Sequence, residues 1–349
     1  MLEFGPLLLK WFACSGRKNL PWQHPKTAYR VWVSEIMLQQ TQVQTVIPYF
    51  IRFIQQFPSV EALANGHEEE VLRLWSGLGY YSRARNLHKT AKIIAFELDG
   101  QFPDEPQALV KLPGIGPSTA AAITSLAFNK PTPILDANVM RVLCRYFAVE
   151  EDPKKARTKK KLWELAKLCM PLHSCAQYTQ AIMDFGATLC TPQKPQCGIC
   201  PFALSCLAKQ QGKVNILPYK QARKSLPTHS KTFLLLHRNN QEIYLEKNPP
   251  TGIWGGLWSM PIFGGNNLEE FLGDNFSYKP IEILSLCKLK HSFSHYHLSM
   301  EIISIEIAPL ENYVKEVPGK WISIEKTKEY GLPQPIRSVI ETWCQIDRV

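Results

Sequence analysis

The stretch that decides the fold reads LPGIGPS, residues 112–118, and it lies between two segments of helical periodicity. Gly114 and Gly116 permit a tight turn and a close approach of the backbone to a ligand. Pro117 suits the first turn of a helix, where its missing N–H leaves no hydrogen bond unmade. The free N–H groups at the start of that helix attract an anion. The pattern predicts a helix-hairpin-helix phosphate clamp; the plainer alternative is an ordinary turn between two helices.

The charge of the chain favours a polyanionic partner for the part that holds this turn. The 349 residues carry 40 Lys and Arg against 30 Asp and Glu, a net charge of +10. Residues 1–227 have a net charge of +12, and residues 228–349 have −2. This asymmetry predicts a basic body that binds nucleic acid. The alternative interpretation is that the excess of basic residues only favours solubility. Apolar runs stay shorter than the ~18 residues of a membrane span, and no secretory signal is expected.

The periodicity predicts two domains of different class, as about 150 residues per domain would suggest. Apolar positions three or four apart, separated by Pro and Gly, predict a helical region over residues 1–212. Residues 213–228 contain Pro and Lys with little periodicity and predict a linker. Alternating stretches predict an α+β domain over residues 229–349, with a hairpin around residues 239–241 and a closing helix over residues 335–346.

Four of the ten cysteines form a cluster with the spacing C-x6-C-x2-C-x5-C. Four thiolates so close in sequence can close around one metal centre. A single Cys-x2-Cys with longer gaps favours an iron–sulfur cluster over structural zinc, which usually uses two separated knuckles. The six scattered cysteines favour a reducing, cytoplasmic setting over a disulfide framework. The predicted ligands are Cys190, Cys197, Cys200 and Cys206.

Two carboxylates stand in apolar settings. Glu35 lies in the helical run 31–38, where desolvation is expected to raise its pKa and keep it a usable acid near neutral pH. A surface Glu at a helix edge is the alternative. Asp136 is predicted to cap the helix that follows it, with backbone N–H groups holding it ionised at a lowered pKa. A Glu of raised pKa beside an Asp of lowered pKa is the pairing that glycosidic bond cleavage uses.

With these residues in place, the sequence resembles the MutY-type adenine DNA glycosylases of the endonuclease III superfamily over nearly the whole chain. Besides the turn and the cysteines, the resemblance rests on residues 20–22, 34–43, 77–86, 134–139 and 183–187. It implies a multidomain fold, in which an all-α helix-hairpin-helix glycosylase body with an iron–sulfur loop precedes a C-terminal α+β Nudix-like domain. The body would comprise a six-helix barrel, residues 25–133, and a subdomain with a 4Fe–4S cluster, residues 1–24 and 134–212.

The resemblance implies a monomeric enzyme that removes adenine mispaired with 8-oxoguanine, or with guanine, from double-stranded DNA in base excision repair. The adenine must leave the base stack to be reached. Glu35 would protonate it, Asp136 would stabilise the oxocarbenium-like sugar, and Asn138 would help to hold the site. Relatives that also cleave the strand carry a Lys just after the hairpin. This chain has Ser118 there, so a monofunctional enzyme is predicted. Replication or repair proteins are further expected partners.

Other positions match family residues that contact DNA, and for several of them core packing is the alternative. By resemblance, the adenine pocket contains Trp22 and Gln180. The duplex would be probed or wedged by Gln39, Gln40, Leu78 and Tyr80. Phosphate would be contacted by Gly114, Gly116 and Lys194. The lesion-sensing loop of the second domain would be Phe293, Ser294 and His295. The acidic signature of true Nudix hydrolases is absent between Phe263 and Leu289, so nucleotide hydrolysis is not expected.

Two other functions compete with this hypothesis. One is an endonuclease III-like glycosylase and lyase for oxidised pyrimidines, against which Ser118 and the second domain argue. The other is an iron–sulfur protein that binds damaged DNA without chemistry, against which Glu35 and Asp136 argue.

Overall fold

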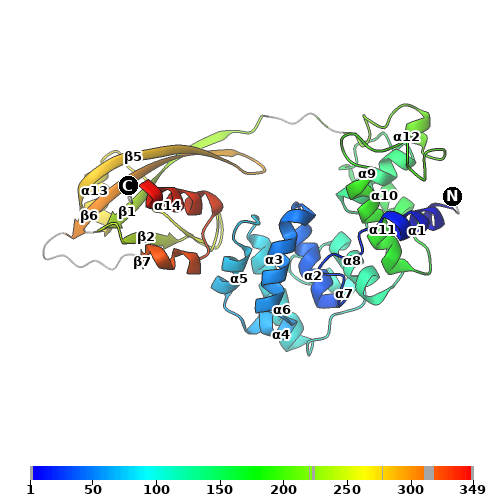
Figure 1. Ribbon diagram of the computed structural model, residues 1–349, viewed down its shortest axis with the longest axis horizontal. Coiled ribbons are helices and arrows are strands. Elements are labelled where there is room, and N and C mark those ends of the chain that lie inside the picture. The colour runs from blue at the N-terminus through cyan, green and yellow to red at the C-terminus, as the bar shows by residue number, and fades with distance from the viewer. Residues whose placement is uncertain (1–2, 220, 222–224, 277, 310–317, 347–349) are drawn as a thin grey trace. The chain divides into compact units, whose positions relative to one another are not determined.

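The computed structural model describes residues 3–219, 221, 225–276, 278–309 and 318–346 (Figure 1). The chain separates into two compact units. The first comprises Met1–Asn65 and Asn86–Arg223, and the second comprises Gly66–Arg85 and Lys224–Val349. Residues 220 and 222–224 of the expected linker lie outside the described residues. Of the described helices, none combines the length and the apolar character that crossing a membrane requires.

The first unit is built from helices, as the periodicity predicts. They are α1 (Phe4–Ser15), α2 (Ala28–Leu38), α3 (Val43–Gln56), α4 (Val60–Asn65), α7 (Pro106–Leu109), α8 (Pro117–Phe128), α9 (Ala137–Tyr146), α10 (Ala156–Cys169), α11 (Cys175–Thr188) and α12 (Leu207–Gln210). Helix α6 (Ser82–Glu97) begins in the second unit and ends in the first. Helix α11 packs against α1, α8 and α9, and Figure 1 shows it among α1, α9 and α10.

Local signals in the sequence determine where the functional helices start. The Thr27 side chain caps α2 by accepting a hydrogen bond from the backbone N–H of Arg30 at 3.2 Å. Pro117 occupies the first position of α8, and Asn129 ends that helix in the left-handed conformation at φ +55°. Helix α2 packs against α8. The start of α8, which follows the Gly-rich turn, is therefore anchored to the helix that carries Glu35.

The second unit contains α5 (Glu68–Trp75) and a mixed seven-stranded sheet with the order β3-β2-β1-β6-β5, in which β4 pairs with β1 and β7 with β2. The elements are β1 (Thr228–Arg238), β2 (Glu242–Lys247), β3 (Trp258–Ser259), β4 (Ile262–Phe263), α13 (Leu268–Phe276), β5 (Tyr278–Ser292), β6 (His297–Pro309), β7 (Gly319–Ser323), the 3-10 helix η1 (Ile324–Glu329) and α14 (Gln334–Ile346). Strands β1 and β6 run parallel, and the other pairs are antiparallel. The predicted hairpin turn is confirmed, since Asn239 and Asn240 adopt positive φ between β1 and β2. The predicted closing helix is confirmed as α14.

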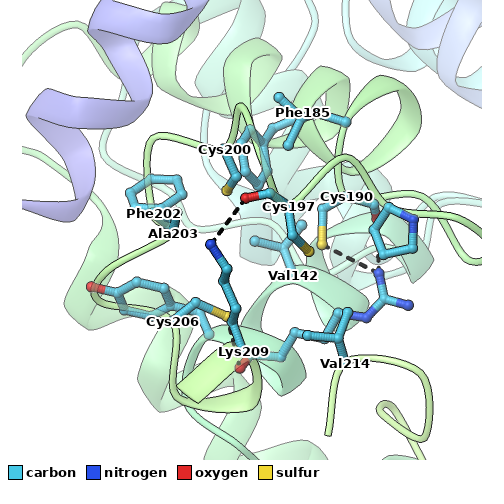
Figure 2. A pocket seen from close by; sticks show the side chains of 14 residues that line it. Val142, Phe185, Cys190, Cys197, Cys200, Phe202, Ala203, Cys206, Lys209 and Val214 are labelled. Atoms are coloured by element: carbon cyan, nitrogen blue, oxygen red, sulfur yellow. Dashed lines mark hydrogen bonds between the residues drawn. The ribbon is translucent and has the colours of Figure 1, made fainter. Parts of the chain in front are cut away.

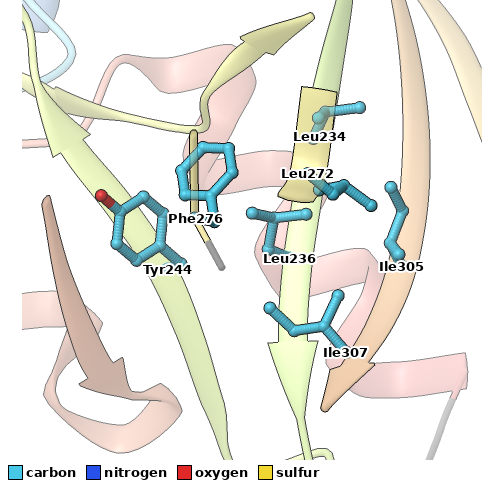
Figure 3. Packing of buried hydrophobic residues seen from close by; sticks show 7 residues of the cluster. All are labelled: Leu234, Leu236, Tyr244, Leu272, Phe276, Ile305 and Ile307. Atoms are coloured by element: carbon cyan, nitrogen blue, oxygen red, sulfur yellow. The ribbon is translucent and has the colours of Figure 1, made fainter. Parts of the chain in front are cut away.

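Helices cover both faces of this sheet. The core on one face consists of Leu234, Leu236, Tyr244, Leu272, Phe276, Ile305 and Ile307 (Figure 3). Two of these side chains, Leu272 and Phe276, come from α13. On the opposite face His237 of β1 lies against Trp343 of α14, with ring centroids 4.8 Å apart. Because successive strand residues point to opposite faces, the two helices sandwich the sheet, and residues 233–237 are buried without alternation.

Candidate active site

Glu35 lies on the apolar helix α2, and its neighbours in the chain, Ser34 and Ile36, are buried. Its own side chain is partly buried. Loss of solvent raises the pKa of its carboxyl to about 8, and the negative charge of Asp136 adds to this shift. The raised pKa predicted from the sequence is thus confirmed. At neutral pH the protonated form predominates, which makes Glu35 a potential proton donor.

Asp136 caps α9 as predicted. Its carboxylate accepts hydrogen bonds from the backbone N–H of Val139 at 2.7 Å and from Asn138 Nδ2 at 3.3 Å. Burial nevertheless raises the pKa of Asp136, while these hydrogen bonds and the charge of Arg141 oppose the rise. The expectation of a lowered pKa is wrong, because the sequence reveals the cap but not the loss of solvent around it. Since the charge of Asp136 raises the pKa of Glu35, the pair favours a protonated Glu35 beside an ionised Asp136.

Arg141, which sequence reasoning overlooked, connects this carboxyl pair to the cysteine loop. Its guanidinium donates hydrogen bonds to Asn138 Oδ1 at 2.9 Å, to the Gly186 carbonyl at 2.7 Å and to the Cys190 carbonyl at 2.8 Å. A Cβ on Gly186 of α11 would lie only 2.7 Å from the Cβ of Asn138, so glycine permits this close crossing of α9 and α11. Two arginines four residues apart in a largely apolar helix, Arg141 and Arg145, were the available signal, and both are buried.

The turn over residues 112–118 joins α7 to α8 as expected. Gly114 has φ +77°, and a Cβ there would lie 2.8 Å from the Cβ of Asn86. Gly116 faces open space, so its backbone is accessible at the start of α8. Ser118 lies on the first turn of α8 and is partly exposed. The hairpin therefore presents accessible backbone N–H groups and Ser118 at one helix end.

The residues expected to probe the duplex differ in exposure. Gln39, just after α2, donates its amide to Thr119 Oγ1 at 3.2 Å. Gln40 is exposed and has φ +60°. In the second unit, Leu78 is only 6% exposed, whereas Tyr80 is 46% exposed. Gln40 and Tyr80 are thus accessible as they stand, whereas the Leu78 side chain is buried in this structure.

Trp22 and Gln180, expected in a base pocket, are both buried in the first unit. The Trp22 ring lies edge-on to Phe50, with centroids 5.4 Å apart. The Gln180 amide donates to Asp184 Oδ1 at 3.0 Å. The fully buried Asp184 also accepts hydrogen bonds from Arg17 Nε at 3.0 Å and from the Arg17 backbone N–H at 2.8 Å. This ion pair, which no local pattern indicated, fixes the orientation of the Gln180 amide.

The four predicted cysteine ligands line one small pocket of the first unit, beside α9, α11 and α12 (Figure 2). Burial raises the pKa of the Cys200 thiol to about 11, and the negative charges of the other three cysteines contribute to that rise. The four sulfur atoms are therefore close enough to interact. As they stand, no three or more His, Cys, Asp or Glu in the described ranges lie together in a geometry that could hold a metal ion.

Two basic side chains surround this pocket. Arg145, only 2% exposed, donates hydrogen bonds to Cys190 Sγ at 3.4 Å and to the Thr191 carbonyl at 2.7 Å. Lys209 donates to the Cys197 carbonyl at 3.2 Å (Figure 2). These two positive charges would offset the negative charge of four thiolates, so the four cysteines suit a thiolate ligand set for a metal. Within the same loop, Lys194 is exposed with φ +50°.

Phe293, Ser294 and His295 form the tight turn between β5 and β6. The backbone N–H of Phe293 donates to the Tyr296 carbonyl at 2.9 Å. The Ser294 hydroxyl and His295 Nδ1 lie 3.2 Å apart, and both side chains are exposed. The Phe293 ring stacks on Tyr296 with centroids 4.8 Å apart. This turn borders a cavity of about 690 Å³ within the second unit.

Comparison with known families assigns both parts of the chain. Residues 33–168 match the HhH-GPD superfamily of base excision DNA repair proteins, and residues 232–342 match the NUDIX domain. A thermostable thymine-DNA glycosylase of known structure matches with a TM-score of 0.54 and 29% identity, over 60% of this chain and 95% of that one. Endonuclease III in a non-covalent DNA complex shares the fold, with a TM-score of 0.51 and 22% identity. The fold and site thus define a helix-hairpin-helix DNA glycosylase with a Nudix-like domain.

Related sequences identify the particular activity. The adenine DNA glycosylase of Buchnera aphidicola subsp. Acyrthosiphon pisum (strain APS) is 41% identical over 345 residues, or 97% of both chains. The adenine DNA glycosylase of Homo sapiens is 30% identical over 400 residues, which cover 96% of this chain and 73% of the human one. The chain belongs to the adenine DNA glycosylase family. It binds DNA and hydrolyses N-glycosyl bonds of adenine in base excision repair.

Proposed function

We propose that this enzyme excises adenine paired with 8-oxoguanine, and also with guanine, and leaves the abasic strand uncut. The observation that carries the proposal is the Glu35 carboxyl, whose pKa is raised to about 8 beside Asp136. Departure of adenine requires a proton on the base, and the sugar left behind develops positive charge. An acid and an anion side by side supply both needs.

Each member of the carboxyl site has a separate role in this proposal. Glu35 donates its proton to the ring of the flipped-out adenine. Asp136 stabilises the oxocarbenium-like sugar, and its carboxylate is oriented by the N–H groups of Val139 and Asn138. Arg141 holds Asn138 through the 2.9 Å hydrogen bond to Oδ1, so that Asn138 keeps its amide on Asp136. The anion is thereby preorganised for the transition state.

Residues around the carboxyl site are proposed to hold the DNA. Trp22 and Gln180 would line the adenine pocket, with the Gln180 amide oriented by Asp184. The backbone at Gly114 and Gly116, with Lys194, would bind phosphate. Side chains proposed to probe or wedge the duplex are Gln39, Gln40, Leu78 and Tyr80. The turn proposed to read 8-oxoguanine consists of Phe293, Ser294 and His295.

We also propose that Cys190, Cys197, Cys200 and Cys206 hold a 4Fe–4S cluster. The four thiols line one pocket, and Arg145 and Lys209 place positive charge beside them, which suits a cluster ligated by thiolates. When bound, the cluster would supply a redox-capable iron–sulfur centre that ties residues 190–206 together. In domain terms, we propose a catalytic region over residues 1–212, a linker over 213–228 and a reading domain over 229–349.

A product assay tests this function. An end-labelled duplex with one adenine opposite 8-oxoguanine is incubated with the enzyme, and the products are resolved with and without hot alkali. Because Ser118 cannot form a Schiff base, we expect a cleaved strand only after alkali. A matched duplex with adenine opposite thymine is the control and should stay uncut. Preference for A:8-oxoguanine over A:G is then measured in single turnovers.

The rival functions predict different products. A band without alkali would indicate the combined glycosylase and lyase activity of enzymes that act on oxidised pyrimidines. Binding of the duplex with no band under either condition would indicate a non-catalytic DNA-binding protein. Equal excision opposite 8-oxoguanine and thymine would contradict the proposed specificity.

A further inference from the structure

Trp254 has an unusual conformation in the segment between β2 and β3. Its φ is +51°, in the left-handed region, although its side chain is large and only 6% exposed. A bulky residue persists there only where its surroundings determine the conformation. Its indole centroid lies 6.0 Å from the ring of Phe233, 5.8 Å from His291 and 6.0 Å from Phe293. Trp254 thus connects β1 and the end of β5 to the turn that follows β5.

The backbone on either side of Trp254 has little freedom to shift. A Cβ on Gly255 would collide with the Pro250 carbonyl, and Gly256 has φ +79°. The Gly255 carbonyl also accepts a hydrogen bond from the Arg85 guanidinium. All of these residues belong to the second unit. The backbone that carries Trp254 is therefore restrained by contacts that do not involve Phe293.

Trp254 also borders the cavity of about 690 Å³ next to the turn. The same cavity is lined by Phe293, Ser294 and His295, and by the exposed Tyr80. The Phe293 ring lies 6.0 Å from that of Trp254, 4.7 Å from that of His291 and 4.8 Å from that of Tyr296, on which it stacks. Phe293 begins the turn, and its backbone N–H closes it on the Tyr296 carbonyl, so contacts to the Phe293 ring act on the segment that carries Ser294 and His295.

We propose that Trp254 is a positioning residue for the recognition of an oxidised purine, and that it acts by holding Phe293 and thereby the turn. This inference rests on the proposed function. An 8-oxopurine differs from guanine in its C8 carbonyl and its N7–H, so discrimination requires polar groups in defined places. Without the indole, the turn would have to become ordered when the DNA binds. The free-energy cost of that ordering would weaken binding through the contacts that are specific to the lesion.

The test compares two buried tryptophans. Trp254→Ala and Trp254→Phe are made beside the control Trp258→Ala, whose ring is 5% exposed, packs against Tyr330 at 5.5 Å and lies outside the cavity lining. In the full-length chain with Glu35→Gln, which keeps the adenine from being excised during the measurement, the dissociation constants for A:8-oxoguanine and A:G duplexes are measured for each variant. The ratio of the two constants is the readout, and melting temperatures report stability.

We expect Trp254→Ala to lower the preference for 8-oxoguanine by about tenfold, the loss typical of one aromatic contact, and Trp254→Phe to restore most of it. Trp258→Ala should lose stability and keep the preference. An unchanged preference in Trp254→Ala would overturn the inference, as would an equal loss in Trp258→Ala. If Trp254→Ala does not fold, Trp254→Leu takes its place. The preference for 8-oxoguanine must then be lower in Trp254→Leu, which has no ring, than in Trp254→Phe. If the unsubstituted chain itself shows no preference, the proposed function fails and not this inference alone.

Discussion

An apolar setting and a second negative charge each help to keep a carboxyl group protonated near neutral pH, and Glu35 has both. Helix α2 supplies the apolar setting, and Asp136 at the start of α9 supplies the charge. Each factor disfavours the ionised form of Glu35. Folding therefore raises the proton affinity of this residue, which couples the stability of the protein to its chemistry.

The first prediction concerns Glu35→Gln. The substitution removes the proton donor, so the single-turnover rate should fall by about 10²–10⁴-fold. For the unsubstituted enzyme the rate should fall as the pH rises through about 8, because the protonated carboxyl is lost.

Stability should also fall as the pH rises, because the folded protein holds this proton more tightly than the unfolded chain does. The folded pKa of about 8 exceeds the ordinary 4.5, so Glu35 contributes stability below pH 4.5 that is lost as the pH rises through 8. The amide does not titrate, so the melting temperature of Glu35→Gln relative to the unsubstituted protein should increase from pH 5 to pH 8 and then level off. Calorimetry across that range provides the measurement. A difference that is constant with pH would show that Glu35 is not held protonated.

Among the elements, the crossing of α9 and α11 builds the site. Asn138 stands at the start of α9 and Gly186 on α11, and no side chain separates them. Arg141 then spans the crossing, with hydrogen bonds to Asn138, to the Gly186 carbonyl and to the Cys190 carbonyl. The carboxyl site and the cysteine loop thus share one helix pair.

The second prediction is that Gly186→Ala impairs catalysis more than folding. The added Cβ would come within 2.7 Å of the Asn138 Cβ, so Asn138 must move and its hydrogen bond to Asp136 weakens. A small misplacement in an active site is expected to lower the rate by about 10²-fold. Gly273→Ala on α13, where a Cβ meets nothing within 4 Å, is the matched control and should stabilise the protein by about 0.5–1 kcal/mol. Single-turnover rates and melting temperatures are measured for both variants. If Gly186→Ala is as fast as Gly273→Ala, α11 adjusts without displacing Asn138.

Elements with strong local signals could be predicted, and features that depend on contacts distant in sequence could not. The turn at residues 239–240, the Asp136 cap and the closing helix α14 all follow from turn chemistry, capping and periodicity. The raised pKa of Asp136 and the reach of Arg141 depend on what α11 places around α9, which no local pattern contains. The same reason hid the pairing of Arg17 with Asp184, which are 167 positions apart.

For the molecule as a whole, charge and chemistry are divided between the two units. Residues 1–227 hold the net charge of +12 together with the Gly-rich turn and the carboxyl pair, as a body that binds a polyanion requires. The sheet carries the aromatic turn. That residues 66–85 belong with the sheet was not predictable from their helical periodicity. Contacts between residues distant in the sequence join these residues to the sheet unit, among them the ion pair between Lys247 and Glu69 at 2.7 Å.

The last prediction concerns the proposed metal centre and distinguishes the two units by their stability. Four thiols and the buried guanidinium of Arg145 share one pocket, and in such a site the free energy of metal binding is also free energy of folding. Removing the metal should lower the melting temperature of the first unit by about 10 °C, since several kcal/mol are lost at about 2–4 °C per kcal/mol. The sheet unit should melt as before.

Cys200→Ser should reproduce the shift and lower the amount of bound metal. Cys14→Ser, which replaces an exposed thiol outside the pocket, should do neither. Scanning calorimetry with elemental analysis measures both effects. Iron in excess over zinc would support the iron–sulfur cluster. If zinc is the only metal found, the site is a structural zinc site. An unshifted first transition would mean that the four cysteines hold no structural metal.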